Sequence, residues 1–328
     1  MRIFGYLRCL AAVLALGLAS CGGGGSSGGS TGTTPPPSSS PSPTPTPTPV
    51  ALTPFSYAAP FAFESSLGIE GTLFNYQESF LNVQRTELVE PRPFPANSTA
   101  RISLDRQGND ETIAFRYDDI TISATRPAES SPEFRVVDPG GAQERLVIGP
   151  LSPGFLRGRS GGPTHVSMAI YRASPVARTI DTRVGTGQRI VYSIFGNPAN
   201  EFGRLARSKE FDVGGASARG LSFGGFFIQS ADYASPNGVF FGVLSVAAFG
   251  SDGQRTFEAD LFIEGEHDIA TNRLSGRFRD RQGGVVIGTF EGGLYGPQRN
   301  HVGLVYNLDL PRWGRDIGAA FGIGADRG

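Results

Sequence analysis

Two neighbouring segments near the carboxyl end of the chain alternate apolar and polar residues with a period of two. The first, RTFEADLFIEGE at 255–266, places four apolar residues on one face: Phe257, Ala259, Leu261 and Ile263. Only Phe262 interrupts the polar face opposite. The second, NRLSGRFRD at 272–280, alternates in the same way. This period is typical of half-buried strands, so we expect a hairpin whose outer charges pair across the strands.

Further strands are expected on both sides of this hairpin, at 221–229, 239–249, 284–296, 301–310 and 315–325. Turn signals separate them: PNG at 236–238, SDG at 251–253, QGG at 282–284 and GPQRN at 296–300. Seven or eight antiparallel strands close into a small barrel, because closure removes the unpaired edges. We therefore predict an antiparallel β-barrel of about eight strands over 206–328.

The rest of the folded chain, residues 55–205, predicts a β-rich, handle-like region. Its strand candidates are 99–105, 111–124, 134–138, 165–173 and 188–196. The one stretch with the character of a short helix is NYQESFLNV at 75–83. With 46 glycines, which weaken helices and suit turns and barrel bends, the whole fold is predicted to be all-β.

The amino terminus has the pattern of an export signal. Arg2 and Arg8 bracket a charged start, and a short apolar run follows that is too short for a membrane span. The run ends in Leu18, Ala19, Ser20 and Cys21, which resemble the bacterial lipobox. The resemblance implies cleavage after residue 20, acylation of Cys21 and membrane attachment through the lipid. The alternative is an ordinary residue after an ordinary cleavage site.

Residues 21–54 predict a linker between the lipid and the folded region. The segment is rich in Gly and Ser, then in Pro and Thr, with PSPTPTPTP at 41–49. Alternating prolines hold polyproline II and leave few backbone donors for helix or sheet. Residues 35–49 would then span about 45 Å. No acidic residue directly follows Cys21, which in such lipoproteins points to the outer membrane.

The number of cysteines and the net charge argue against several classes of function. After removal of residues 1–20, Cys21 is the last cysteine, so neither an internal disulfide nor a thiolate metal site can form. The mature chain has 27 basic and 30 acidic residues, because two of the 29 basic ones lie in the signal, and its net charge is −3. Such a balance does not predict a nucleic-acid partner.

The segments 287–308 and 316–328 resemble the barrel domain of the transferrin-binding-protein-B-like surface lipoproteins. The motif residues shared with that family are Gly288, Phe290, Gly292, Tyr295, Gly296 and Pro297. His301 stands where the family usually has glutamate, and 187–200 is similar to the segment before its barrel. The resemblance covers roughly 165–328. It implies one lobe, a handle beside a barrel, and a protein or a haem- or iron-related ligand, but it identifies no binding residue here.

The motif residues have physical roles in such a scaffold. We expect Gly288 and Gly292 to let a strand bend at a barrel corner, and Phe290 to fill the interior. Gly296 and Pro297 predict a tight turn.

Chemistry-bearing residues are few. Ser160, in GRSGG at 158–162, satisfies the nucleophile-elbow pattern, but no helix is expected after it, as that elbow needs. His165, His267 and His301 have no metal-finger spacing, although separate strands can converge. The simpler interpretation is two strand-end histidines and one turn histidine. We predict no cofactor, no metal site and no catalytic residue.

Aromatic residues in 223–227 and 239–242 predict rings on both faces of their strands. The expected use of the outward rings is packing between barrel and handle, and the alternative is a partner site. The function predicted is non-catalytic binding by an outer-membrane, surface-displayed lipoprotein in nutrient or iron acquisition. A structural or adhesive envelope role and a hydrolase using Ser160 stay open.

Overall fold

The structure is a computed structural model. It describes residues 51–57, 59–78, 80–127, 133–137, 143–149, 164–231, 237–249, 253–280 and 284–326. The chain divides into two units, Met1–Pro47 and Thr48–Gly328, and every described residue belongs to the second. The predicted signal, the lipobox residues with Cys21, and all of the linker up to residue 50 therefore lie outside the described residues.

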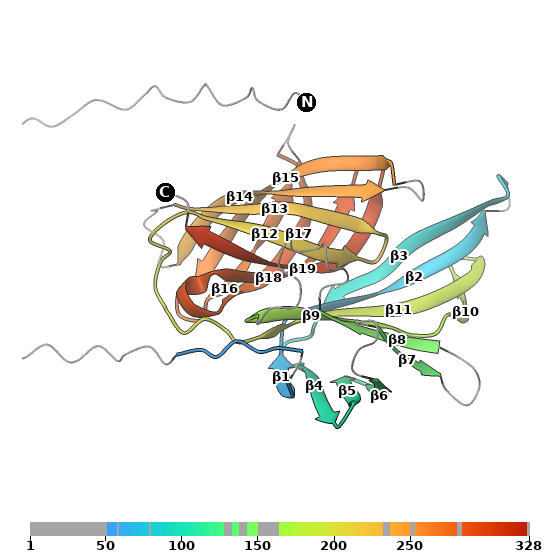
Figure 1. The fold of residues 1–328 in the computed structure, drawn as a ribbon. Helices are drawn as coiled ribbons and strands as arrows, with labels where there is room; N and C mark the ends of the chain where they lie inside the picture. The colour runs from blue at the N-terminus through green and yellow to red at the C-terminus, as the bar shows by residue number, and fades with distance from the viewer. Residues whose placement is uncertain are drawn as a thin grey trace, which may run out of the picture. The chain divides into compact units, whose positions relative to one another are not determined.

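Eight strands form a closed antiparallel barrel (Figure 1). They are β12 (Lys209–Ser217), β13 (Leu221–Ala231), β14 (Gly238–Phe249), β15 (Arg255–Asp268), β16 (Arg273–Arg279), β17 (Val286–Tyr295), β18 (His301–Leu310) and β19 (Gly314–Asp326). Each strand pairs with the next, and β12 pairs with β19 to close the circle. The all-β fold and the eight-stranded barrel are confirmed, and β12 is the barrel strand that the sequence pattern did not predict.

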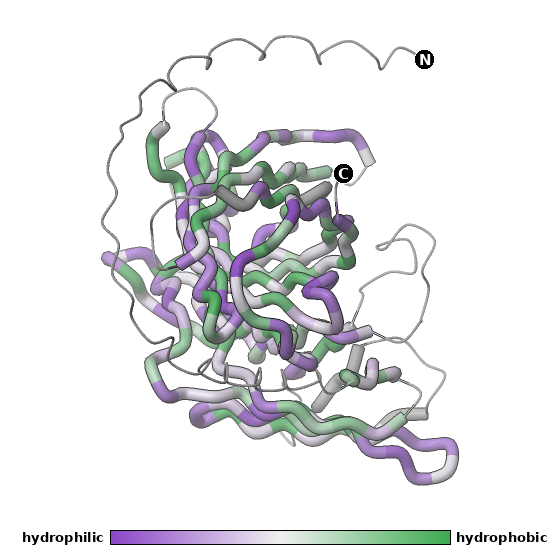
Figure 2. Tube along the Cα trace, turned by 90° about the vertical axis from the view of Figure 1, so that its left-hand side faces the viewer, coloured by the Kyte–Doolittle hydropathy of each residue, from purple (hydrophilic) through white to green (hydrophobic). Residues whose placement is uncertain are grey.

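The barrel interior is apolar. On β15, Leu261 and Ile263 are buried in it, whereas Phe262 between them is exposed. Glu264 of β15 binds Arg279 of β16 at 2.7 Å and Arg277 at 3.7 Å. Both the inward face and the cross-strand charge pairing are as predicted. Figure 2 shows hydrophilic and hydrophobic residues alternating along many of the strands.

Two further sheets precede the barrel, and we call them together the handle. The four-stranded sheet has the order β1 (Phe61–Ser65), β4 (Ala100–Gln107), β5 (Asp110–Tyr117), β6 (Ile120–Pro127). The seven-stranded sheet has the order β3 (Val83–Pro93), β2 (Gly68–Glu78), β11 (Arg183–Gly196), β9 (Val166–Arg172), β8 (Gln143–Ile148), β7 (Glu133–Val137), with β10 (Val176–Ile180) also paired to β11.

The seven-stranded sheet packs on both sides. One face contacts the four-stranded sheet through a core that includes Ile102, Phe115 and Val191. The other face shares a core with β18 and β19 of the barrel, where Ile194 lies with Val305 and Ala319. The handle and the barrel therefore share one core. The domain boundary predicted at residue 205 stays a prediction.

Two of the handle interpretations need correction. Residues 75–78 of the stretch that could have held a short helix lie in β2, and residues 80–82 form the turn before β3. Glu78 pairs there with Val83, so a tight hairpin takes the place of a helical turn. The expected single strand at 111–124 is two strands, β5 and β6, because the chain turns at Asp118, whose φ is 53°.

The connection from handle to barrel is tied to the end of β17. The Asn197 backbone N–H donates to the His165 carbonyl at 2.8 Å, and the Gly296 N–H donates to the Asn197 carbonyl at 3.0 Å. A short 3-10 turn, Pro297–Arg299, follows and leads into β18. This arrangement places the loop after β17 directly against the handle.

Among the described residues, no helix combines the length and the apolar character needed to cross a bilayer.

Candidate binding site

The candidate site is the free end of two hairpins of the seven-stranded sheet, which we call the arm. One hairpin joins β2 to β3, and the other joins β10 to β11. Gly185 near the start of β11 pairs with Tyr76 near the end of β2. Both turns therefore lie at the same end of the sheet, and Figure 1 shows these strands continuing beyond the barrel.

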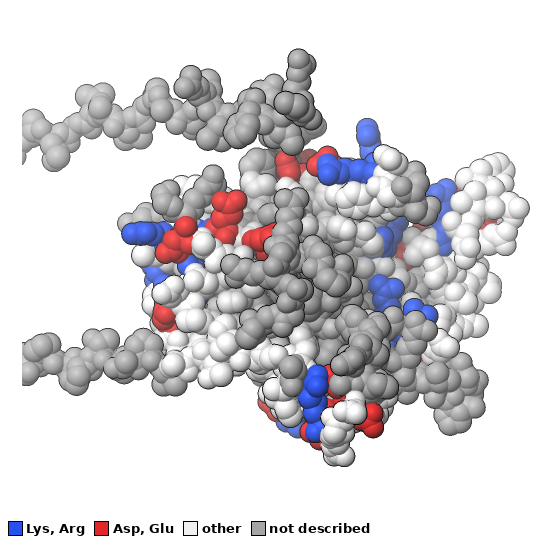
Figure 3. Space-filling view, in the orientation of Figure 1, with Lys and Arg blue, Asp and Glu red and all other residues white. Residues whose placement is uncertain are grey.

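Apolar side chains lie in solvent at this end. Phe80 in the first turn is 95% exposed, and Val184 on β11 is 75% exposed. Leu81 and Val83 beside Phe80 are also exposed. We call Phe80, Leu81, Val83 and Val184 the arm tip. The end of the hairpin of β2 and β3, at the right of Figure 3, has few charged side chains on the face shown. Phe80, Leu81 and Val83 follow closely along the chain, and exposed apolar residues gathered in this way mark interaction surfaces.

The strands behind the arm tip are held by side-chain bonds. The Tyr76 hydroxyl donates to Glu87 at 2.5 Å, and Arg183 binds Glu87 at 2.7 Å. The hydrogen bond from Tyr76 is the main reason that the pKa of Glu87 lies below its ordinary value. The Arg183 guanidinium also lies 4.6 Å from the centre of the Tyr76 ring. These contacts neutralise the charges next to the arm tip and hold the two hairpins in register.

A buried carboxylate fixes the base of the arm to the rest of the handle. Glu70 of β2 is buried, and it binds Arg92 of β3 at 2.7 Å and Arg189 of β11 at 2.8 Å. Arg189 also binds Asp119, between β5 and β6, at 2.6 Å. The cluster thus joins both sheets of the handle. The side chains of Asp118 and Asp119 are exposed at this place.

Exposed apolar side chains also lie on the outer wall of the barrel, among charged ones. The register places five residues of neighbouring strands β13 to β17 in one row, the barrel row: Phe227, Val243, Phe262, Arg279 and Val286. Phe262 and Val286 are exposed, as is Phe241 in the adjacent row. The prediction that these aromatic strands pack against the handle was wrong, because the shared core is built on the opposite strands, β18 and β19.

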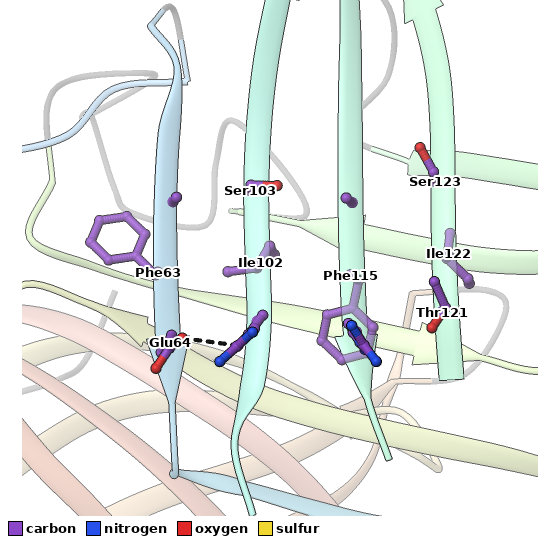
Figure 4. A pocket seen from close by; sticks show the side chains of 12 residues that line it. Phe63, Glu64, Ile102, Ser103, Phe115, Thr121, Ile122 and Ser123 are labelled. Atoms are coloured by element: carbon purple, nitrogen blue, oxygen red, sulfur yellow. Dashed lines mark ion pairs between the residues drawn. The ribbon is translucent and has the colours of Figure 1, made fainter. Parts of the chain in front are cut away.

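The outer face of the four-stranded sheet carries a shallow groove of about 420 Å³. Its floor is a row of small residues, one from each strand: Ala62, Ser103, Ala114 and Ser123. Glu64 and Arg101 form a 2.9 Å ion pair in the next row. Figure 4 shows the groove across the four strands, with this ion pair dashed. The small side chains leave the space, and no buried polar group in the lining is aimed into it.

The motif residues lie on β17 and in the turn after it. Phe290 is 3% exposed inside the barrel, with its ring centre 5.1 Å from that of Phe278. A side chain on Gly288 or Gly292 would collide with a backbone oxygen of β18, so close strand approach requires both glycines. Tyr295 is buried against the handle. Gly296 has a φ of 68° and precedes Pro297 at the start of the 3-10 turn.

The three histidines separate into a pair and a single residue. His165, just before β9, and His301, the first residue of β18, have ring centres 5.1 Å apart. His267 lies near the end of β15, and its Nε2 is 3.1 Å from Oδ1 of Asn272. The spacing of the histidines in the sequence did not predict that His165 and His301 lie close together. Ser160 lies outside the described residues.

The arm tip was also missed by the sequence interpretation. The signal for it was present, because Asn82 follows Phe80 and Leu81 and adopts a φ of 53°. Asparagine tolerates this left-handed conformation, and such a residue between two polar runs is typical of a hairpin turn.

No family model matches the chain, and no curated protein matches it either. Among solved structures, similar ones include a double mutant of transferrin-binding protein B from Haemophilus parasuis, with 9% identity, a TM-score of 0.24, and coverage of 86% of this chain and 79% of that one.

Two other solved structures are similar at the same level. Transferrin-binding protein B from serogroup B Neisseria meningitidis has 11% identity and a TM-score of 0.24, with coverage of 82% of this chain and 77% of that one. A DUF3598-family protein of unknown function from Nostoc punctiforme has 7% identity and a TM-score of 0.25, with coverage of 79% and 95%. At these scores the matches identify no ligand for this chain.

Proposed function

We propose that the protein is a lipid-anchored outer-membrane protein, displayed at the cell surface, that binds a protein partner without catalysing a reaction. The lipobox at 18–21 and the Pro-rich linker support the anchor and the display. The resemblance of the barrel motif supports a role in iron or nutrient acquisition. In this proposal the arm tip is the contact surface, and the barrel is the scaffold that carries it.

The observation that carries the proposal is the 95% exposure of Phe80 at the end of a braced hairpin. Exposed aromatic residues that a rigid scaffold holds contribute large contact area with little loss of side-chain entropy on binding. The surrounding charges are already paired within the chain, as Arg183 and Glu87 illustrate. The partner surface is therefore expected to be an apolar recess, and the affinity should depend little on salt.

We expect Phe80→Ser to weaken partner binding by about thirtyfold, which corresponds to about 2 kcal/mol for a central aromatic contact. The full chain, in detergent and immobilised, would capture partners that mass spectrometry then identifies. Surface plasmon resonance of the captured protein against wild type and variant measures the loss. Phe80 touches no core, so the thermal unfolding midpoint should stay unchanged.

Phe202→Ser is the matched control, because Phe202 is an exposed phenylalanine outside the arm. Its affinity for the captured partner should equal that of wild type. Equal binding by Phe80→Ser and wild type would contradict the arm tip as contact surface. Absence of any captured protein, together with no binding of haem or iron, would contradict the acquisition role.

A structural or adhesive role in the envelope is the second candidate, and the barrel row favours it. Phe262 lies at the centre of that row on the side away from the handle. If Phe262→Ser abolishes capture while Phe80→Ser does not, the barrel wall is the contact surface and this candidate replaces the first.

The anchor has its own test. Cys21→Ser should release the protein from the membrane fraction, because acylation needs the thiol and several acyl chains are needed for stable attachment. Mass spectrometry of the wild-type amino terminus should show a modified Cys21, and protease treatment of intact cells should cleave the protein. An unmodified, soluble wild-type product would contradict the anchor.

A further inference from the structure

His165 and His301 come from different parts of the fold and meet at the junction of handle and barrel. His165 directly precedes β9 of the handle, and His301 begins β18 of the barrel. Their ring centres are 5.1 Å apart, and the ring planes are inclined by 66°. The third histidine, His267, takes part in a separate contact with Asn272.

Gly296 leaves room for the two rings. A Cβ atom on this residue would lie 2.8 Å from Nδ1 of His301 and 2.9 Å from Cγ of His165. The glycine also adopts a φ of 68°, which other residues rarely take. The absence of a side chain at Gly296 therefore allows both imidazoles to approach the same small volume.

One ring nitrogen of His165 is unsatisfied within the described part of the chain. The residue is 6% exposed, and its buried Nδ1 has no hydrogen-bond partner in the described part of the chain. A buried polar atom in this state calls for a partner that the protein itself does not supply. Burial also lowers the pKa of His165, which keeps the imidazole neutral, the form that binds metals. His301 is half-buried.

The spacing of the rings fits metal binding. Two imidazoles that bind one tetrahedral ion at about 2.1 Å have ring centres about 5 Å apart. The observed separation is 5.1 Å. Neutral imidazole is a ligand preferred by Cu²⁺, Ni²⁺ and Zn²⁺.

We propose that His165 and His301 together bind one divalent cation of the Cu²⁺, Ni²⁺ and Zn²⁺ class at the junction of handle and barrel. Within the described ranges, no group of three or more His, Cys, Asp or Glu residues gathers around an ion position, so water completes the coordination. Because one ligand belongs to each part of the fold, the bound ion cross-links the handle to the barrel. This site is independent of the arm tip.

Isothermal titration of the full chain in detergent, purified without a histidine tag, with Zn²⁺ and with Cu²⁺ tests the site. We expect one ion per chain, and at least tenfold weaker binding in His301→Ala and in His165→Ala. Zn²⁺ should raise the thermal unfolding midpoint of wild type and leave that of His301→Ala unchanged. Protons compete with the cation for neutral imidazole, so binding should weaken on acidification.

His267→Gln is the matched control, since His267 is the remaining histidine of the 328 residues, and its affinity should equal that of wild type. Cys21→Ser checks that the thiol is not the ligand. His165 is buried, so His165→Ala must first show a wild-type circular dichroism spectrum. If it does not fold, electron paramagnetic resonance of Cu²⁺ on wild type decides, with two nitrogen ligands expected.

No binding of either ion at millimolar concentration would overturn the proposal. So would a wild-type affinity in His301→Ala, or a Cu²⁺ spectrum without two nitrogen ligands. Partner capture through Phe80 is a separate measurement, so failure of one proposal leaves the other standing.

Discussion

Phe290→Ala is expected to lower the free energy of unfolding by about 3–5 kcal/mol, the usual cost of removing a buried aromatic ring. Phe290 is 3% exposed, and its ring centre lies 5.1 Å from that of Phe278 and 6.1 Å from that of Phe240. These rings come from three different strands, so the barrel wall cannot close over the cavity without moving its backbone. Urea unfolding followed by circular dichroism measures the loss.

Phe262→Ala is the matched control on the same barrel. Phe262 is 43% exposed on the outer face, so its removal forfeits little buried area and should cost less than about 1 kcal/mol. The two variants remove the same atoms from opposite sides of the sheet. Equal losses would contradict the assignment of Phe290 to the interior.

The barrel could be predicted because its strands are half-buried. On β15, Leu261 and Ile263 face a core while Glu264 faces water, and this contrast is visible in sequence. Strand β18, at His301–Leu310, has the predicted bounds. Turn residues set the limits of each strand, so local sequence contained both the strand pattern and its ends.

The handle was harder to predict because its seven-stranded sheet packs on both sides and carries buried charge. Glu70 in β2 is buried, although a carboxylate normally marks an exposed face. Its partners Arg92 and Arg189 are distant in sequence, so the alternation looks irregular until the ion pairs are known. In the same region, the stretch around Phe80 could have held a short helix, and the pairing of Glu78 with Val83 shows the hairpin that Asn82 signals.

The positions of the candidate sites depend on packing that no local pattern contains. Aromatic residues such as Phe241 were assigned to the handle interface because they are large and apolar. The interface is instead built on β18 and β19, where Val305, Ala319 and Phe321 approach the sheet and share its core. The same packing of the handle against the barrel brings His165 and His301 together. Their positions in the sequence therefore did not predict that they lie close to each other.

Asp316→Ala is expected to lower the free energy of unfolding by about 2–4 kcal/mol, because it leaves buried donors unpaired. Asp316 is fully buried where β19 meets the turn after β12. The Ser217 hydroxyl donates to its carboxylate at 2.8 Å, the Arg219 backbone N–H at 3.1 Å and the Trp313 Nε1–H at 3.2 Å. Trp313 is the one tryptophan of the chain, so its fluorescence reports on this end of the barrel during urea unfolding.

The same carboxylate predicts a dependence on pH with a definite sign. Burial raises the pKa of Asp316 above its ordinary value of 3.8, because the three donors only partly offset the loss of water. A carboxyl whose pKa is higher in the folded state stabilises the fold when protonated, and this stabilisation is lost as pH rises from the unfolded pKa through the folded one.

The variant Asp316→Asn stays neutral throughout. The free energy of unfolding of wild type minus that of Asp316→Asn should therefore fall as pH rises above about 4, because only the wild type must ionise a buried group. A difference that rises over this interval would mean that the hydrogen bonds from Ser217, Arg219 and Trp313 outweigh burial, and that the carboxylate is stabilising in its charged form.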